Sequence, residues 1–318
     1  MAVYTEVSFE DLEALLGFYD VGNPLSFKGI AEGVENSNFQ LRTDKGAYIL
    51  TLYEKRVKEE DLPFFLGLMD HLAAKGVPCP LPVPRRDGSL WGHVNGKSAA
   101  LLTWLDGLSL HRPDVTHCAD VGAACARLHE AGQGFAIARP NALGPEGWRK
   151  LADSTASDAD SVEQGLALLI SRSLGDLERD WPSGLPGGVI HADLFPDNVL
   201  FMPGRVSGLI DFYFACNDAF VYDLAVMLNA WCFESDGYNL TKGRALVSAY
   251  RKHRELSPAE REAFPILARG AALRFLLTRL YDWLHSDPLA MVRPKDPREY
   301  SRKLRFHLKA ANAAAYGF

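Results

Sequence analysis

One short stretch of the chain places several polar side chains between two apolar runs. Residues 187–201 read GGVIHADLFPDNVLF, in which His191, Asp193 and Asn198 follow the pattern H-x-D-x-x-x-x-N. A further aspartate, Asp211, follows the predicted hairpin VLFMPGRVSGLI. Apolar runs of this kind predict buried strand ends. The polar residues must then lie on loops at the edge of a core, where each of them needs a bonding partner.

These side chains suit the transfer of a phosphoryl group to a hydroxyl. That reaction needs a group that orients the attacking hydroxyl and accepts its proton, and oxygen ligands that hold Mg²⁺ on the phosphates. Asp193 suits the first role, and Asn198 and Asp211 offer the oxygen ligands that Mg²⁺ prefers. The alternative is a turn whose Asn and Asp side chains satisfy the loop backbone. The aspartate after the hairpin favours the catalytic interpretation.

The overall composition excludes several classes of protein. The 318 residues are 47% hydrophobic and 23% charged, with a net charge of −6. That is an ordinary globular balance without the basic surface that nucleic acid or an anionic membrane would attract. Five cysteines without a C-x-x-C pair predict reduced, buried thiols. With no signal peptide and no apolar run near the ~18 residues that span a bilayer, we expect a cytoplasmic protein without nucleic-acid or membrane partners. The sequence leaves its oligomeric state open.

The elements that position these residues fall into two groups along the chain. Before residue 105 the patterns predict a helix at 8–19, two antiparallel strands around the turn TDKG within 25–54, a helix at 59–76 and a hairpin at 88–105. After it they predict mainly helices, with SPAE at 257–260 as a capping box that starts a long one. We expect an α+β fold with a small N-terminal antiparallel-sheet lobe, residues 1–103, and a large mainly helical lobe, residues 104–318.

The segment HADLFPDNVLF…GLIDF, placed after a strand-rich lobe, resembles the catalytic segment of the aminoglycoside-phosphotransferase-like branch of the protein-kinase fold. The resemblance covers essentially the whole chain. It implies a bilobal kinase with ATP as co-substrate and Mg²⁺. It also implies that Asp193 is the catalytic aspartate, that Asn198 and Asp211 bind the metal, and that His191 braces the loop.

Departures from protein kinases indicate a small-molecule substrate. Ala192 stands where protein kinases carry the arginine that binds activation-loop phosphate, and Tyr213 stands where their second metal motif has its glycine. The stretch between Asp211 and Asp223 is too short for an activation segment. We therefore expect a constitutively assembled enzyme that acts on a small molecule.

The resemblance also implies a nucleotide site in the small lobe. It places these residues near the phosphates or the adenine: Gly29, Gly33, Ser37, Asn38, Thr103, Trp104 and Leu105. The glycine spacing departs from G-x-G-x-x-G, and Thr51 stands where the family usually has a lysine or arginine. Lys28, Lys55 or Arg56 remain open as the replacing cation, with Glu59 or Glu60 as its partner.

Within that branch, GVENSNFQLRT…YILTLYE and HADLFPDNVLF most closely resemble bacterial homoserine kinases, which act in threonine biosynthesis. This resemblance implies an amino-acid substrate with its γ-hydroxyl aimed at Asp193. Expected substrate contacts, by position, are Tyr213, Asp218, Glu234 and Arg274. Two alternatives stay open: the same fold acting on an aminoglycoside, choline or a methylthioribose-like sugar, and a nucleotide-binding pseudokinase. A metal hydrolase is disfavoured because no second histidine cluster accompanies His191.

Overall fold

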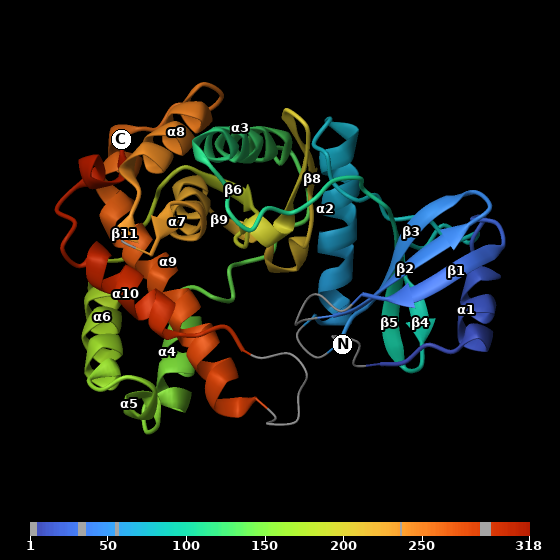
Figure 1. The fold of residues 1–318 in the computed structure, drawn as a ribbon, viewed down its shortest axis with the longest axis horizontal. Coiled ribbons are helices and arrows are strands. Elements are labelled where there is room, and N and C mark those ends of the chain that lie inside the picture. The colour runs from blue at the N-terminus through green and yellow to red at the C-terminus, as the bar shows by residue number, and fades with distance from the viewer. Residues whose placement is uncertain (1–4, 31–35, 55–56, 236, 287–293) are drawn as a thin grey trace. The chain divides into compact units, whose positions relative to one another are not determined.

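The chain divides into two compact units in the computed structural model, which describes residues 5–30, 36–54, 57–235, 237–286 and 294–318 (Figure 1). The first unit comprises residues 1–107 with 207–213, and the second comprises 108–206 with 214–318. The predicted lobes, 1–103 and 104–318, lie close to these units, but they assign the segment 207–213 to the other part. As a division into functional domains, the predicted one stays a prediction.

Hydrogen bonds explain why the segment 207–213 belongs to the first unit. The hydroxyl of Ser207 donates to the carbonyl of Asp106 at 2.7 Å. The amide of Leu209 donates to the carbonyl of Pro78 at 2.8 Å. Because backbone groups that leave water need such partners, these bonds attach the segment to residues that precede it by about a hundred positions.

A five-stranded antiparallel sheet forms the centre of the first unit. Its order is β1-β2-β3-β5-β4. The elements are α1 (Phe9–Leu16), β1 (Pro24–Gly29), β2 (Ser37–Thr43), β3 (Gly46–Leu52), η1 (Glu59–Asp61), α2 (Leu62–Ala74), β4 (Gly92–Val94) and β5 (Lys97–Thr103). The two strands predicted around TDKG are β2 and β3. The sequence did not predict β1, which pairs with β2 at the sheet edge and has no fully buried position.

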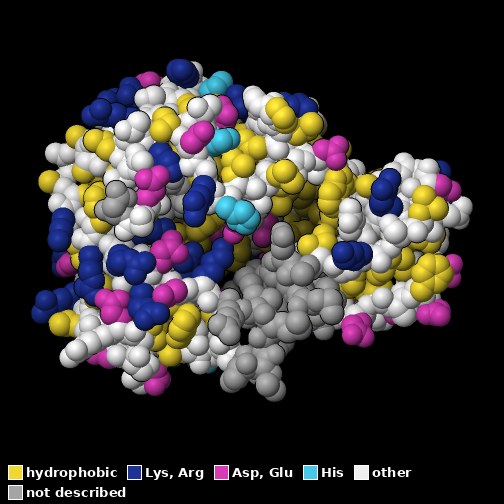
Figure 2. Space-filling model, in the orientation of Figure 1, with side chains coloured by type: hydrophobic (Ala, Val, Ile, Leu, Met, Phe, Trp, Pro, Cys, Tyr) yellow, Lys and Arg dark blue, Asp and Glu magenta, His cyan; other side chains and the backbone are white. Residues whose placement is uncertain are grey.

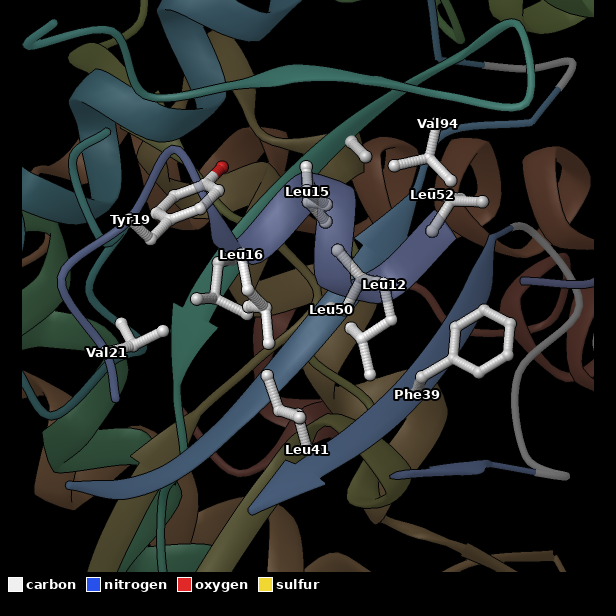
Figure 3. Close-up of a cluster of buried hydrophobic side chains, with 12 residues drawn as sticks. Leu12, Leu15, Leu16, Tyr19, Val21, Phe39, Leu41, Leu50, Leu52 and Val94 are labelled. Atoms are coloured by element: carbon white, nitrogen blue, oxygen red, sulfur yellow. The ribbon is translucent and has the colours of Figure 1, made fainter. Parts of the chain in front are cut away.

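The core of the first unit lies between α1 and the sheet (Figure 3). A capping box starts the helix: the hydroxyl of Ser8 accepts from the Asp11 amide at 3.1 Å, and the Asp11 carboxylate accepts from the Ser8 amide at 3.0 Å. Leu12, Leu15 and Leu16 then face the sheet. Each buried leucine contributes about 1.5–3 kcal/mol, so this contact holds the strands that carry Ser37, Asn38 and Thr51.

The second unit is mainly helical, as the sequence predicted. Its helices are α3 (Val115–Ala131), α4 (Pro145–Thr155), α5 (Ala159–Val162), α6 (Leu166–Asp180), α7 (Phe220–Trp231), α8 (Leu240–Arg251), α9 (Pro258–His285) and α10 (Arg298–His307). Its short strands are β6 (Gly187–Ile190), β7 (Val199–Met202), β9 (Cys216–Ala219), β10 (Phe233–Glu234) and β11 (Gly237–Tyr238), while β8 (Arg205–Leu209) leads back to the first unit. Single 3₁₀ turns are η2 (Pro196–Asn198), η3 (Phe212–Phe214) and η4 (Ala313–Tyr316).

Helices α3 and α8 pack side by side at very short range (Figure 1). The reason is Gly122 of α3: a Cβ atom there would lie 2.3 Å from the carbonyl oxygen of Leu246 in α8. Only glycine lets the two backbones approach this closely. The same contact brings His129 of α3 within reach of Tyr250 of α8, which matters for the site described below.

Charged side chains of both signs gather over the face of the second unit that carries α6 and α10 (Figure 2). Ion pairs here include Arg279–Glu299 at 2.6 Å and Lys303–Glu299 at 2.5 Å. All five cysteines are buried and none forms a disulfide, as the sequence predicted. Among the described residues, no helix combines the length and apolarity that crossing a membrane requires, and this includes the 28-residue α9.

Candidate active site

The H-x-D segment lies in the second unit, between two short strands. The apolar runs predicted as strand ends are β6 and β7, and Ile190 and Val199 are fully buried. β6 pairs with β9 so that Ile190 lies opposite Cys216. The loop 191–198 therefore starts and ends at fixed points of the core, which is the placement that a site built on a rigid scaffold needs.

Asp193 and Asn198 lie in direct contact. The side-chain amide of Asn198 donates to Asp193 Oδ2 at 3.0 Å and to the Asp193 carbonyl at 2.8 Å. Because the amide nitrogen makes both bonds, the amide oxygen of Asn198 is the group left to act as an acceptor. An amide oxygen beside a carboxylate is the type of ligand pair that Mg²⁺ prefers.

His191 lies where a residue that braces the loop is expected. It is fully buried, and its Nδ1 accepts from the amide of Asp193 at 3.3 Å. The next residue, Ala192, has a left-handed backbone with φ of 61°. Such a conformation costs a non-glycine residue roughly 1–2 kcal/mol. It persists only where the surroundings hold it.

Asp223 of α7 and Arg274 of α9 hold this strained turn. The two oxygens of the Asp223 carboxylate accept from the amides of His191 at 2.8 Å and Ala192 at 2.9 Å. The guanidinium of Arg274 donates to the Ala192 carbonyl. Burial alone would raise the pKa of Asp223, but the hydrogen bond from His129, the electrostatic interactions with the His129 and His191 imidazoles, and the amide of His191 outweigh it and lower that pKa. An ionised, buried carboxylate thus positions the backbone next to Asp193.

The sequence interpretation missed Asp223 as a member of the site. A signal was available: one aspartate interrupts the apolar run AFVYDLAVML. A charged residue inside a buried helix must have bonding partners, because burying an unpaired charge is very costly. Two of its partners are the backbone amides of His191 and Ala192, however, and no residue type or spacing reveals which amides they are.

Asp211 lies in the first unit, whereas Asp193 and Asn198 lie in the second. It also has a left-handed backbone, with φ of 64°. Among the described residues, its buried Oδ1 has no hydrogen-bond partner. Burial raises the pKa of its carboxyl to about 6, although the amide of Tyr213 donates to it. A desolvated carboxylate oxygen that accepts no hydrogen bond from the described residues is available to coordinate a cation. Asp211 therefore fits the predicted Mg²⁺ role.

The strand residues predicted near the phosphates lie on β2 and β3 of the first unit. Asn38 and Thr51 are register partners, and the Thr51 hydroxyl donates to Asn38 Oδ1 at 2.8 Å. The hydroxyl of Ser37 donates to Glu54 at 2.7 Å, and Glu54 also pairs with Lys97 at 3.2 Å. Lys97, half-buried on β5, is a cation beside this strand that the sequence interpretation did not name as a replacement for the missing lysine.

The remaining residues predicted near the phosphates have separate places. Gly29 ends β1 opposite Phe39, and Lys28 is exposed on the same strand. Gly33, Lys55 and Arg56 lie outside the described residues. Glu59 binds Ser98 at 2.7 Å and His93 at 3.0 Å.

The stretch predicted to meet the adenine follows β5 directly. Thr103 donates its amide to the Leu81 carbonyl at 2.9 Å, and Trp104 donates its amide to the Ala47 carbonyl at 3.2 Å. The indole of Trp104 donates to Asp106 at 3.1 Å, and the side chain of Leu105 is half-buried. The first two amides of this stretch are therefore already used within the unit.

Of the four residues expected to contact the substrate, Arg274 lies against the loop 191–198. It is 1% exposed and its guanidinium binds the Ala192 carbonyl. The other three also have partners: Tyr213 contacts the Tyr53 hydroxyl at 3.3 Å, Asp218 accepts from Asn141 at 2.7 Å, and Glu234 pairs with Lys242 at 2.6 Å. Asp218 lies opposite Gly188, at the end of β6 away from the loop.

Comparison with known proteins adds the family. A model described as the phosphotransferase enzyme family matches residues 26–256. A homoserine kinase of Chelativorans sp. (strain BNC1) is 60% identical over 318 residues, which is 100% of this chain and 99% of that protein. A homoserine kinase of Parvibaculum lavamentivorans is 58% identical with the same coverage.

Solved structures with low sequence identity share the fold. A spectinomycin phosphotransferase in complex with ADP and spectinomycin superposes with a TM-score of 0.70 at 12% identity, covering 99% of this chain and 98% of that one. An amicoumacin kinase in complex with AMP-PNP and Ca²⁺ gives a TM-score of 0.71 at 12% identity, covering 96% and 95%. The predicted fold class, the kinase-like fold of these phosphotransferases, is confirmed.

Proposed function

The chain belongs to the phosphotransferase enzyme family and groups within it with the homoserine kinases, and we propose that it phosphorylates L-homoserine. In this reaction ATP and L-homoserine give ADP and O-phospho-L-homoserine, a step of threonine biosynthesis that we place in the cytoplasm. The observation that carries the proposal is the identity of 58–60% along the full length of curated homoserine kinases. The pairing of Asp193 with Asn198 supports it independently of that identity.

Asp193 is the group proposed to act on the attacking hydroxyl. Its carboxylate would orient the γ-hydroxyl of homoserine and take its proton as the phosphoryl group transfers. The amide of Asn198, which donates to Asp193 Oδ2, holds the carboxylate in one orientation. The carboxylate of Asp223 holds the backbone that precedes Asp193, because it accepts hydrogen bonds from the amides of His191 and Ala192.

Asn198 and Asp211 are the residues proposed to hold Mg²⁺. The bound cation would offset the charge of the phosphates. The amide oxygen of Asn198 and Oδ1 of Asp211, which has no hydrogen-bond partner in the described part of the chain, are the proposed ligand atoms. Because these two residues stand in different units, their convergence on one cation is part of the proposal.

The nucleotide contacts are proposed from the first unit. In the stretch after β5 we assign the adenine contact to the backbone of Leu105, since the amides of Thr103 and Trp104 donate elsewhere. Near the phosphates the proposed positions are Gly29, Gly33, Ser37 and Asn38.

The proposed acceptor contacts are Tyr213, Asp218, Glu234 and Arg274. Each of these side chains has a partner within its own unit. A phosphoryl-acceptor substrate that binds one of these four side chains has to share or displace the hydrogen-bond or ion-pair partner of that side chain. Alanine substitution at a true contact should raise KM for homoserine and leave KM for ATP unchanged.

The decisive experiment follows phosphate transfer directly. The protein is incubated with ATP, Mg²⁺ and L-homoserine, and the product is read by ³¹P NMR. Choline, kanamycin and methylthioribose serve as competing acceptors, and transfer to one of these alone would replace homoserine in the proposal. Nucleotide binding in a thermal-shift assay without transfer to any acceptor would point to a pseudokinase.

The role of Asp193 has its own test. General-base assistance contributes ~10²–10⁴-fold, so Asp193→Ala should lower kcat by about that factor while KM for ATP changes little. Asp197→Ala is the matched control, because Asp197 is an exposed neighbour that pairs with Lys295. Turnover within a few-fold of wild type in a folded Asp193→Ala protein would contradict the role.

A further inference from the structure

A buried chain of hydrogen bonds leads from the catalytic loop to the first turn of α9. Asp223 Oδ2 lies 3.0 Å from His129 Nε2, and His129 Nδ1 lies 2.8 Å from the Tyr250 hydroxyl. That hydroxyl lies 3.3 Å from Arg254 Nη1, and Arg254 Nη2 lies 2.7 Å from Glu260 Oε1. His129, Tyr250, Asp223 and Glu260 are at most 1% exposed. Side chains on four helices, or on the loop between two of them, thus share one continuous polar network.

The chemistry of its two ends fixes the direction of this chain. Arginine can only donate hydrogen bonds, and an ionised carboxylate can only accept them. The Tyr250 hydroxyl therefore accepts from Arg254 and donates its single proton to His129 Nδ1. His129 is left with its proton on Nε2, which it donates to Asp223. The bonds are all satisfied only when the imidazole is neutral and carries its proton on Nε2.

A second proton on His129 would break this arrangement. Nδ1–H would point at a hydroxyl that already accepts from Arg254, and the proton of that hydroxyl would lose its acceptor. The groups that face the imidazole are Asp223 from α7, Tyr250 from α8, Arg254 from the turn that follows it, and Cys125 from α3, whose Sγ lies 3.5 Å from Nε2. The ring of Phe220 packs on the His129 imidazole, with the two ring centroids 4.8 Å apart.

A metal ion is a weaker interpretation of the same residues. Ligand atoms of Cys125, His129 and Asp223 lie within 4.8 Å of one another. However, the Asp223 oxygens already accept from two backbone amides and from His129, and both His129 nitrogens are in hydrogen bonds. The geometry is that of a hydrogen-bonded pair.

We propose that Tyr250 is a positioning residue for phosphoryl transfer. Its hydroxyl holds His129 as the neutral Nε2–H tautomer. His129 in turn fixes the carboxylate of Asp223, which holds the amides of His191 and Ala192 and hence the turn that presents Asp193. The inference rests on the proposed function to the extent that this loop is catalytic.

The network also predicts how the effect depends on pH. Without the hydroxyl, no donor occupies His129 Nδ1, and the hydrogen-bond geometry no longer excludes a second proton on the imidazole. An imidazolium competes with the loop amides for the Asp223 carboxylate. Removing the hydroxyl should therefore do more harm in mildly acidic solution than in mildly basic solution.

The test variant is Tyr250→Phe, which keeps the ring and removes only the hydroxyl. We expect kcat to fall roughly tenfold near pH 6, less than the ~10²-fold that a 1 Å misplacement can cost, and about twofold near pH 8.5. KM for ATP and homoserine should stay within about twofold, because the variant leaves the binding residues intact. Tyr19→Phe is the control, since the buried Tyr19 hydroxyl has no hydrogen-bond partner among the described residues.

A second variant isolates the histidine. His129→Gln keeps an N–H donor near the Nε2 position but cannot titrate. In this background, Tyr250→Phe should change kcat by the same factor at every pH. Two results would overturn the proposal: an effect of Tyr250→Phe that is independent of pH when His129 is present, or one that still depends on pH in the His129→Gln background.

Histidine NMR provides a readout that needs no activity. In the wild-type protein at pH 7, the ¹⁵N shifts of His129 should show a neutral imidazole with its proton on Nε2, as the hydrogen bonds to Tyr250 and Asp223 require. In Tyr250→Phe the Nε2–H tautomer should no longer be the only form, because the hydroxyl that faces Nδ1 is gone. A doubly protonated His129 in the wild type at that pH would refute the inference even if the variant fails to fold. If no acceptor is phosphorylated while the NMR prediction holds, the proposed function is at fault and the network is not.

Discussion

Two residues of the segments that carry the proposed site, Ala192 and Asp211, hold left-handed backbone conformations that ordinarily favour glycine. Ala192 immediately precedes Asp193, and Asp211 itself is a proposed metal ligand. Such strain persists only where surrounding bonds over-determine it, and it clusters at functional sites. At Ala192 the bonds come from Asp223 and Arg274. The two residues independently mark the same loops that the spacing of polar side chains singled out.

Asp211 should make the protein less stable in the absence of Mg²⁺. Its pKa of about 6 lies above the ordinary aspartate value, so the folded state resists ionisation. Stability should fall as pH rises from about 4 to 6 and stay lower above that. Asp211→Asn removes this cost, so at pH 8 without Mg²⁺ it should raise the free energy of unfolding by roughly 1–3 kcal/mol.

Urea unfolding at pH 8 and pH 4 measures this effect. The gain of Asp211→Asn should vanish near pH 4, where the folded state keeps the aspartate protonated and the unfolded chain is close to its own pKa. The variant should also weaken the Mg²⁺ dependence of turnover. A magnesium titration identical to that of wild type would remove Asp211 from the metal site, and Asp197→Asn should change neither property.

The residues of the candidate site were accessible from the sequence to different degrees. The order and spacing of Asp193, Asn198 and Asp211 are local features, so the motif alone was enough to propose them, and their roles stay predictions. The contributions of Asp223 and Arg274 are bonds to loop backbone, and these depend on how α7 and α9 pack. Arg274 was expected to bind substrate, and the structure places its guanidinium on a carbonyl of the loop. Its role in substrate binding stays a prediction.

At the level of elements, the close packing of α3 and α8 depends on one glycine. Gly122→Ala would place a methyl group 2.3 Å from a backbone oxygen, which cannot rotate away. We expect a loss of about 1–3 kcal/mol in unfolding free energy, as for other overpacked sites. The control is Gly175→Ala in α6, where nothing lies within 4 Å of the new Cβ. It should gain about 0.5–1 kcal/mol from higher helix propensity. Equal stabilities in urea unfolding would contradict the packing argument.

Helix α10 contains a histidine that should make stability depend on pH. His307 is fully buried between Tyr316 and Asn229, and burial together with the charges of Lys303 and Arg269 lowers its pKa to about 3. Between about pH 6.5 and 3, His307 binds a proton in the unfolded chain but not in the folded state. Stability should therefore fall as pH falls, by up to about 1.4 kcal/mol per pH unit.

Replacing His307 isolates its contribution to that pH dependence. His307→Asn should be less stable at neutral pH, because it loses buried hydrogen bonds, but its unfolding free energy should decrease less steeply between pH 6 and 4.5. The measurement is a series of urea unfolding curves across that range. His285→Asn, at an exposed position, should keep the wild-type slope. The same slope in His307→Asn would show that His307 does not titrate as described.

Elements with strong local signals were predictable, and those defined by long-range pairing were not. The helices α1 and α9, whose N-cap residues are Ser8 and Ser257, have capping boxes in the sequence and in the structure. Strand β1 has little alternation and no fully buried residue, so its only evidence is its pairing with β2. That pairing is a property of the folded sheet.

For the molecule as a whole, the sequence predicted two consecutive lobes, whereas the first unit takes in a distant segment. Nothing in the composition of residues 207–213 marks them as partners of Asp106 and Pro78. The assignment depends on hydrogen bonds between residues far apart in the chain. Patterns read from short windows carry no information of that kind.

Native-state hydrogen exchange in urea can check this assignment. If the units open separately, the amide of Leu209 should exchange with the same free energy and urea dependence as that of Leu101 in β5. It should differ from the amide of Val226 in α7, which belongs to the second unit. Exchange of Leu209 in step with Val226 would show that the segment unfolds with the second unit.

The discontinuous first unit also has a consequence for synthesis of the protein. A chain emerging from the ribosome at about 5–20 residues per second needs on the order of 5–20 s to produce residues 108–206. During that interval the five-stranded sheet is complete in sequence but lacks the segment that bonds to Asp106 and Pro78. The small unit can thus reach its final form only after a large part of the second unit has been translated.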